Sequence, residues 1–187
     1  MLAEADGHTP AAAIIAPDPG AHVGVIERYG AEEIYTVAHP IFADPRVDPL
    51  LDALTTVVEE VDPRVVAFSS SETVGELLGA LAVRTDAAAL PEVTSFELGD
   101  DGGVDAVRPV MAAKAMARTR STTDRTLVSV RAAAYDAEEH PVDATVTSVS
   151  FSFDESDLRR TVCETVTAAA GDVDLKRRAS WWPPGAA

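Results

Sequence analysis

The chain has 187 residues, enough for one α/β domain with a hydrophobic core. Its 31 acidic residues outnumber its 15 basic residues, so the formal net charge is −16. A field of this sign repels DNA and anionic lipid, so we expect no nucleic-acid binding and no direct membrane insertion.

The first half of the chain alternates predicted strands and helices. Short apolar or β-branched runs predict strands at 11–17, 32–38 and 64–68. Apolar residues at helical spacing predict helices at 21–30, 47–61 and 72–85. Gly30 is a natural C-cap for the first of these helices. The alternation favours a parallel sheet that is covered by helices on both faces.

The second half is dominated by predicted strands. Residues 92–110 predict two strands around the turn GDDGG, and further strands are predicted at 125–131 and 144–153. Residues 112–119 fit either a short helix or a strand of small residues. Residues 154–170 predict a helix that ends at Gly171. The fold class is therefore α/β: a Rossmann-like, mostly parallel sheet with helices on both faces and added antiparallel strands.

The loop in VVAFSSSETVGELL leaves a predicted strand and opens a predicted helix. Ser69 and Glu72 have the spacing of a capping box, which predicts a plain helix cap. An anion or nucleotide contact is the alternative, because helix N-termini attract anions. The loop lacks the glycines and the lysine of a phosphate-binding loop, and these absences argue against a nucleotide.

Other residue types predict no catalytic, cofactor-binding or metal site. The four histidines are scattered and lack metal-ligand spacing, and no G-x-S-x-G sequence is present. The single cysteine, Cys163, excludes an internal disulfide, and we expect it to be a buried structural thiol.

The sequence also predicts where the protein works and whether its surface is adapted to salt. We find no apolar run that spans a bilayer and no signal peptide in residues 1–12, so we expect a cytoplasmic protein. The acidic surplus and the presence of only two lysines indicate a halophilic surface, with an ordinary acidic protein as the alternative.

Residues 107–139 carry a more specific signature. Arg108, Pro109, Lys114, Ala115 and Ala117 match the pattern R-P-[IV]-x-[AG]-G-[KN]-A-x-A. A second group matches V-x-T-V-R followed by an aromatic residue: Val128, Val130, Arg131 and Tyr135. Both patterns are similar to those of the N-terminal domain of the electron transfer flavoprotein α subunit. The resemblance covers roughly residues 11–175, and includes YGAEEIYTV and the helix FDESDLRRTVCETVTAAAGDVDL.

The chain departs from this family at several positions. The arginine and glycine of the family's loop are replaced by Gly75 and Val74, and the second glycine after Arg-Pro is replaced by Ala113. MLAEADG resembles the family's first strand, but the usual long helix before the next strand is missing. After Leu175 the family pattern stops, and the motifs of the C-terminal FAD domain do not follow.

We therefore divide the chain at residue 175. Residues 1–175 are expected to form the α/β domain, and residues 176–187 are an atypical tail that holds both tryptophans and a Lys-Arg-Arg cluster. We interpret the tail as the product of a frameshift after Leu175. A genuine short paralogue with its own tail is the alternative.

The resemblance implies a non-catalytic electron-carrier subunit. Its family forms a heterodimer that takes electrons from flavin dehydrogenases, notably the acyl-CoA dehydrogenases of fatty acid β-oxidation, and passes them through a quinone oxidoreductase to the quinone pool. FAD belongs to the complete heterodimer, mainly to the C-terminal α domain, so none is expected in this chain alone. The N-terminal domain packs against the β subunit.

Three residues are expected at or near that interface: Arg108, Lys114 and Arg131. Salt bridges within the domain are the alternative role for these side chains. Two other readings of the whole chain stay open: a stand-alone nucleotide-binding module that uses loop 69–73, and a non-functional remnant of a truncated gene.

Overall fold

A computed structural model describes residues 8–154 except 45, 100 and 133, together with residues 156, 158 and 164. Residues 1–7, Cys163 and the tail 176–187 lie outside the described residues, as does most of the helix predicted at 154–170. The predictions made for these segments stay predictions.

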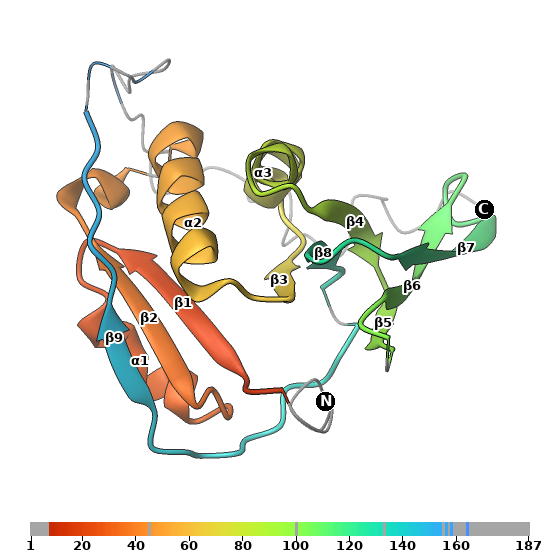
Figure 1. Cartoon of the computed structure of the whole chain (residues 1–187), viewed down its shortest axis with the longest axis horizontal. Coiled ribbons are helices and arrows are strands. Elements are labelled where there is room, and N and C mark those ends of the chain that lie inside the picture. Colours follow the sequence, from red (N-terminus) through yellow and green to blue (C-terminus); the bar gives the residue numbers. More distant parts are fainter. Residues whose placement is uncertain are drawn as a thin grey trace, which may run out of the picture.

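The described chain folds into three sheets and the helices that cover them (Figure 1). In chain order the elements are β1 (Ala11–Ala16), α1 (Gly20–Glu27), β2 (Glu33–Ala38), the 3₁₀ helix η2 (Pro40–Ala43), α2 (Val47–Val61), β3 (Val65–Ser69), α3 (Glu72–Arg84), β4 (Ala88–Val93), β5 (Ser95–Leu98), β6 (Val104–Val110), β7 (Ala115–Ser121), β8 (Thr126–Val130) and β9 (Thr145–Ser148).

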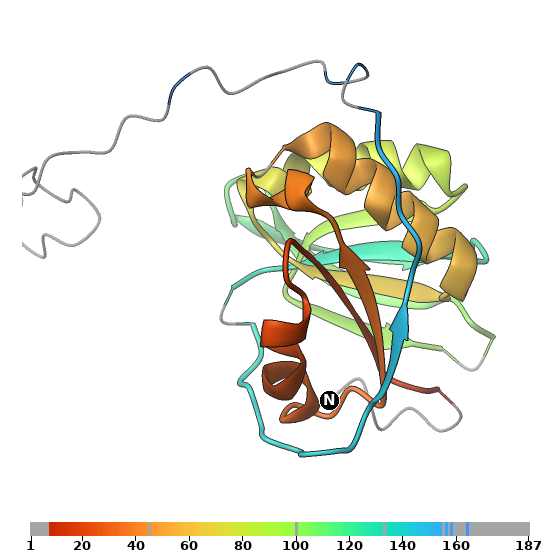
Figure 2. The same cartoon turned by 90° about the vertical axis from the view of Figure 1, so that its left-hand side faces the viewer.

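Two of the sheets are parallel and one is antiparallel. The parallel sheets have the strand orders β1-β2-β9 and β3-β8-β4, and the antiparallel sheet has the order β5-β6-β7. Helices α2 and α3 lie next to each other on one face, and α1 lies on the opposite face of the β1-β2 pair (Figure 2). This architecture confirms the predicted α/β class with its added antiparallel strands.

The main apolar cluster lies between the α2–α3 pair and the parallel strands. Leu81 and Leu127 are fully buried in it, and Leu51, Leu54, Leu77 and Leu78 complete its centre. Strand β8 pairs with β3 on one side and β4 on the other, so Thr126–Ser129 are buried throughout. Burial on both faces fits the apolar Leu127 and Val128 at its centre, and the hydroxyls of the two buried polar residues, Thr126 and Ser129, have hydrogen-bond partners.

Arg125, just before β8, joins the C-terminal ends of two helices. Its Nη1 donates to the Thr85 carbonyl at 2.8 Å, and its Nε donates to the Pro63 carbonyl at 3.3 Å. Its Nη2 also pairs with Asp62, the left-handed C-cap residue of α2. The guanidinium therefore satisfies carbonyls where α2 and α3 end, at the negative poles of their dipoles.

None of the helices in the described part of the chain is long and apolar enough to cross a membrane. Likewise, the described His, Cys, Asp and Glu residues form no group that could hold a metal ion.

Candidate partner-binding surface

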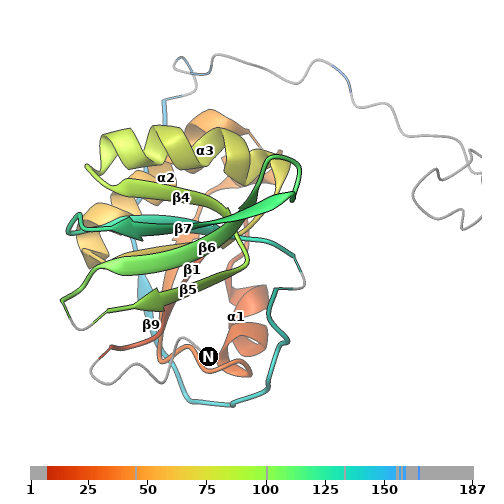
Figure 3. The same cartoon turned by 90° about the vertical axis from the view of Figure 1, so that its right-hand side faces the viewer.

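Most of the β6–β7 hairpin lies in a basic segment of an acidic protein. Residues 106–123 contain four basic residues and no acidic residue, although the whole chain carries a charge of −16. The hairpin's one acidic residue, Asp105 at the start of β6, pairs with Arg120. The hairpin lies at the outer side of the molecule, on the sheet β5-β6-β7 (Figure 3). It therefore presents a local positive surface, which favours an acidic partner.

Lys114 and Arg118 are two of the exposed cations of this hairpin. Neither side chain makes a hydrogen bond or an ion pair with another residue of the described part. Two methionines beside them are unusually exposed, Met111 by 76% and Met116 by 56%. Flexible methionines next to exposed cations suit a binding surface, because their side chains adapt to a partner's shape. We call Lys114, Arg118, Met111 and Met116 the hairpin surface.

Arg120, the fourth basic residue of the segment, has a structural role. Its Nη2 donates to both carboxylate oxygens of Asp101 at 2.6 Å, and its Nη1 pairs with Asp105. The Gly103 N–H and the Arg120 guanidinium hold the pKa of Asp101 below its ordinary value. These contacts tie β7 to the β5–β6 turn, so Arg120 is not available to a partner.

The predicted interface residues separate into two places. Arg108 is half-buried and its Nη1 donates to the Pro91 carbonyl at 3.4 Å, while Nε of the exposed Arg131 lies 3.6 Å from Oε2 of Glu92. Both arginines thus meet the end of β4, whereas Lys114 lies at the hairpin tip. The contacts with Pro91 and Glu92 give Arg108 and Arg131 a role within the domain. The exposed Arg131 pair contributes little stability.

Sequence reasoning missed Arg118, Met111 and Met116 as surface residues. The available signal was the absence of Asp and Glu from 106–123 in a chain otherwise rich in both.

Helix α3 is capped by Ser71, so the predicted capping residue Ser69 was wrong. The Ser71 Oγ accepts the Val74 N–H at 3.2 Å, whereas Ser69 still belongs to strand β3. The register of β3 with β8 extends the strand by one residue beyond the predicted 64–68 run and moves the cap. The Ser70 N–H donates a hydrogen bond to the Val130 carbonyl, and the Ser70 hydroxyl donates one to the Ser129 Oγ. The polar groups of this loop are thus largely occupied within the domain.

The profile of the electron transfer flavoprotein domain matches residues 1–155. The chain belongs to the electron transfer flavoprotein family. It is 25% identical over 147 residues to the electron transfer flavoprotein subunit alpha of Bacillus subtilis, covering 79% of this chain and 45% of that protein. It is 30% identical over 81 residues to protein FixB of Azorhizobium caulinodans, covering 43% of this chain and 22% of that protein. The chain spans less than half the length of these relatives.

The tip of the hairpin explains a glycine in the electron transfer flavoprotein pattern. Met111, Ala112 and Ala113 all have positive φ, and the φ of Ala113 is 62°. The family pattern has glycine at this position, where a residue without a Cβ adopts the left-handed conformation freely. The alanine of this chain carries the strain that the glycine avoids.

We therefore expect Ala113→Gly to stabilise the protein. The change relieves left-handed strain but adds entropy to the unfolded chain, so the net gain is about 0.5–1 kcal/mol. Thermal unfolding of both proteins checks the sign. Ala117→Gly, within β7, is the matched control and should destabilise, because glycine weakens a regular strand. A lower melting temperature for Ala113→Gly would contradict the assigned turn geometry.

Proposed function

We propose that this chain is the N-terminal scaffold domain of an electron transfer flavoprotein α subunit. It would form part of a heterodimeric carrier that passes electrons from flavin dehydrogenases, including acyl-CoA dehydrogenases, to the quinone pool. The domain match over residues 1–155 carries the proposal, and the relative named subunit alpha supports it. In this proposal the domain performs no chemistry of its own and contributes a binding surface.

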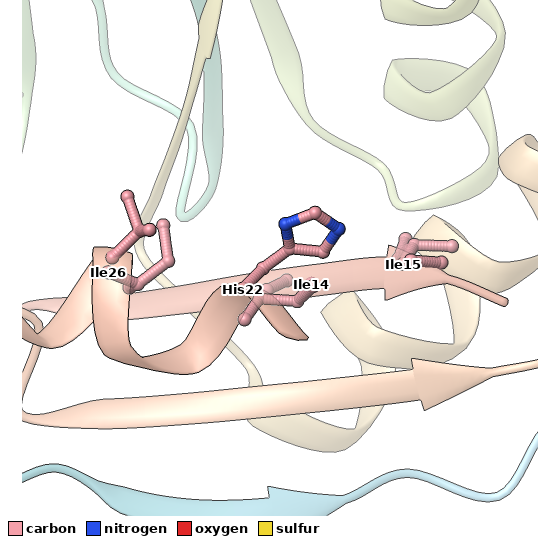
Figure 4. Close-up of a pocket in the computed structure, with 7 residues that line it drawn as sticks. Ile14, Ile15, His22 and Ile26 are labelled. Atoms are coloured by element: carbon pink, nitrogen blue, oxygen red, sulfur yellow. The ribbon is translucent and has the colours of Figure 1, made fainter. Parts of the chain in front are cut away.

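FAD in this proposal belongs to the complete heterodimer. The residues that the structure describes do not fit a flavin. The loop before α3 lacks the glycines that let backbone approach a pyrophosphate, and its Ser70 and Ser71 side chains already have protein partners. A groove between β1 and α1 is lined almost wholly by apolar side chains (Figure 4). We therefore assign no described residue to the cofactor.

The β subunit is the partner that we propose for the hairpin surface. Lys114 and Arg118 offer positive charge that no described residue neutralises, and Met111 and Met116 offer apolar area beside it. An acidic patch on the partner would be attracted by this surface. The same patch would be repelled by the acidic surfaces elsewhere on the chain, so it would bind only at the hairpin. Arg108 and Arg131 would not contact the partner directly, and would support the surface by holding the end of β4 through Pro91 and Glu92.

The experiment that tests the proposal measures affinity for an electron transfer flavoprotein β subunit by isothermal titration calorimetry at fixed salt. We expect the double variant Lys114→Glu/Arg118→Glu to bind roughly tenfold more weakly or worse, because it sets like charges against each other. The control Arg28→Glu/Arg84→Glu makes the same change in net charge at exposed sites away from the hairpin.

The unmodified chain tests the proposed function, and the two double variants test whether the hairpin surface is the binding site. If the unmodified chain does not bind the β subunit, the proposed function is wrong. If both double variants lose the same affinity, the interface lies elsewhere and only the hairpin assignment fails.

We also propose that the acidic surface is halophilic and that the protein works in a salt-rich cytoplasm. Repulsion within a chain of charge −16 weakens the folded state, and salt screens it. We expect the melting temperature to rise by several degrees between 0.1 and 2 M KCl, with most of the gain below about 1 M, where the Debye length falls to roughly 3 Å. A flat or falling melting temperature would identify an ordinary acidic protein.

A further inference from the structure

The antiparallel sheet β5-β6-β7, which faces the viewer in Figure 3, has two edges, and the described residues protect only one of them. At the β5 edge, the Phe96 N–H donates to the Tyr135 hydroxyl at 3.2 Å. Strand β7 pairs with β6 alone, and no described residue makes a hydrogen bond with the backbone groups on its other side. We call this unpaired side of β7 the β7 edge.

The contacts between β5 and β6 show which way the backbone of β6 points. The Thr94 N–H donates to the Val107 carbonyl at 2.8 Å, and the Gly99 N–H donates to the Gly103 carbonyl at 2.8 Å. Both acceptors are odd-numbered and face β5. Because backbone groups alternate in direction along a strand, the even-numbered residues of β6 point theirs toward β7.

The register of β6 with β7 then identifies the backbone groups at the β7 edge. Arg108 lies opposite Ala117, so the even-numbered residues of β6 bond the odd-numbered residues of β7. Pro109 agrees with this pattern, since it has no N–H and lies opposite Met116, in a pair that exchanges no hydrogen bonds. The residues of β7 that present their N–H and carbonyl groups at the β7 edge are Met116, Arg118 and Arg120.

Strand β7 is exposed at its side chains as well as at its edge. Of its seven residues, only Ser121 is buried. The three outward-facing residues offer backbone donors and acceptors that an added strand of about five or six residues would use. Native proteins usually cover or interrupt such an edge, because it is a template for pairing with another chain. An unprotected edge beside the hairpin surface therefore suits a partner that adds a strand.

Charge selects the kind of strand that the β7 edge accepts. Arg118 lies at its centre and Lys114 lies at the hairpin tip, and neither has an ion-pair partner among the described residues. Two copies of this chain that paired antiparallel through Arg118 would set this arginine directly against its counterpart, and like charges across a strand pair repel. An acidic segment would instead place opposite charges side by side.

We propose that the β subunit adds an extended acidic segment to the β7 edge, as a fourth strand of this sheet. The proposal rests on the function proposed above and specifies how the partner binds. Backbone hydrogen bonds to Met116, Arg118 and Arg120 supply affinity, and the side chains of the added strand supply selectivity. An acidic side chain opposite Arg118 fixes the register, because opposite charges directly across a strand pair attract each other.

The first test compares Met116→Pro with its matched control, Met116→Ala, in the full chain. Both variants lose the methionine side chain, but only proline removes the N–H at the β7 edge. Edge strands tolerate proline where that N–H faces away from the sheet, so we expect both variants to fold. In calorimetric titrations with a purified electron transfer flavoprotein β subunit, Met116→Pro should bind roughly tenfold more weakly than Met116→Ala, because it loses one backbone hydrogen bond to the added strand.

Hydrogen exchange followed by NMR supplies an independent readout on the unmodified chain. In the free chain the Arg118 amide should exchange fast, because it faces the β7 edge, whereas the Ala117 amide is already bonded to β6 and should exchange slowly. With the β subunit in excess, the Arg118 amide should exchange roughly tenfold more slowly or less, and the Ala117 amide should change little. Only an added strand produces this alternation between neighbouring residues.

The outcomes distinguish this proposal from the proposed function. If the β subunit binds but the exchange of the Arg118 amide does not change, or if Met116→Pro and Met116→Ala bind equally well, strand addition is wrong and the proposed function stands. If the unmodified chain does not bind the β subunit, both are wrong. A melting curve of each variant shows whether it folds, and if Met116→Pro does not fold, the Arg118 amide alone decides.

Discussion

Replacing Leu127 with alanine should lower the free energy of unfolding by about 3–5 kcal/mol. Leu127 is 0% exposed at the centre of β8, and it packs in the apolar cluster beneath α2 and α3. The change removes buried methyl groups and leaves a cavity, because a strand paired on both sides cannot move in to fill it. Denaturant unfolding, followed by circular dichroism, gives the free energies.

Val83→Ala is the matched control for this prediction. Val83 is 85% exposed on α3, so its truncation should change the free energy of unfolding by no more than about 0.5 kcal/mol. If Leu127→Ala costs less than about 1 kcal/mol, the core does not form around β8 and the strand order is wrong.

The elements best predicted from the sequence are those whose pattern and packing agree. Helix α2 spans Val47–Val61, identical to its prediction, because its leucines and valines repeat at helical spacing and six of its residues are buried. Strands β1, β2, β3 and β8 match their predictions to within a residue or two at each end. Each is a short apolar or β-branched run bounded by turn residues, and each lies in a parallel sheet.

Strand β4 was missed because its residues are poor strand formers. It reads AALPEV, and proline and alanine are depleted in strands. Its register with β8 shifts between Leu90 and Val93, and Glu92 has a φ of 58°. The Ser129 Oγ accepts the Glu92 N–H at 2.9 Å and holds this irregularity in place. A contact between residues so far apart in sequence leaves no local signal.

The strand predicted at 144–153 pairs only over Thr145–Ser148. Strict alternation predicted a longer strand, but Phe151 leaves the sheet to contact two aromatic rings near η2. Its ring centroid lies 5.3 Å from that of Phe42 and 5.6 Å from that of His39. The segment 112–119 shows the same limit. Its sequence fitted either a short helix or a strand, and the structure shows that it forms the strand β7, paired with β6.

The candidate surface could be predicted only in part for a similar reason. Arg108, Lys114 and Arg131 were recognised from a linear pattern, but the fold places two of them around Pro91 and Glu92, at the end of the strand that was missed. The hairpin surface depends on which residues of β7 and of the turn before it remain exposed. That property follows from the position of β7 at the edge of its sheet.

Replacing Arg125 with alanine should lower the free energy of unfolding by about 2–4 kcal/mol, because its three contacts are charge-assisted and cannot all be replaced by water. The Arg125 side chain is only 16% exposed, whereas its partner Asp62 is 84% exposed. Most of the loss therefore comes from the Thr85 and Pro63 carbonyls and not from the ion pair. Thermal and denaturant unfolding both check the value.

Two further variants separate geometry from charge. Arg125→Lys keeps the positive charge near the ends of α2 and α3 but loses the planar fork, so it should recover less than half of the loss. Arg84→Ala removes an exposed arginine that pairs with Asp52, and should cost less than about 1 kcal/mol. If Arg125→Lys is as stable as the unmodified protein, charge at the helix ends is sufficient. If it is not, this arginine, inside the segment that identifies the family, stabilises the fold by its shape.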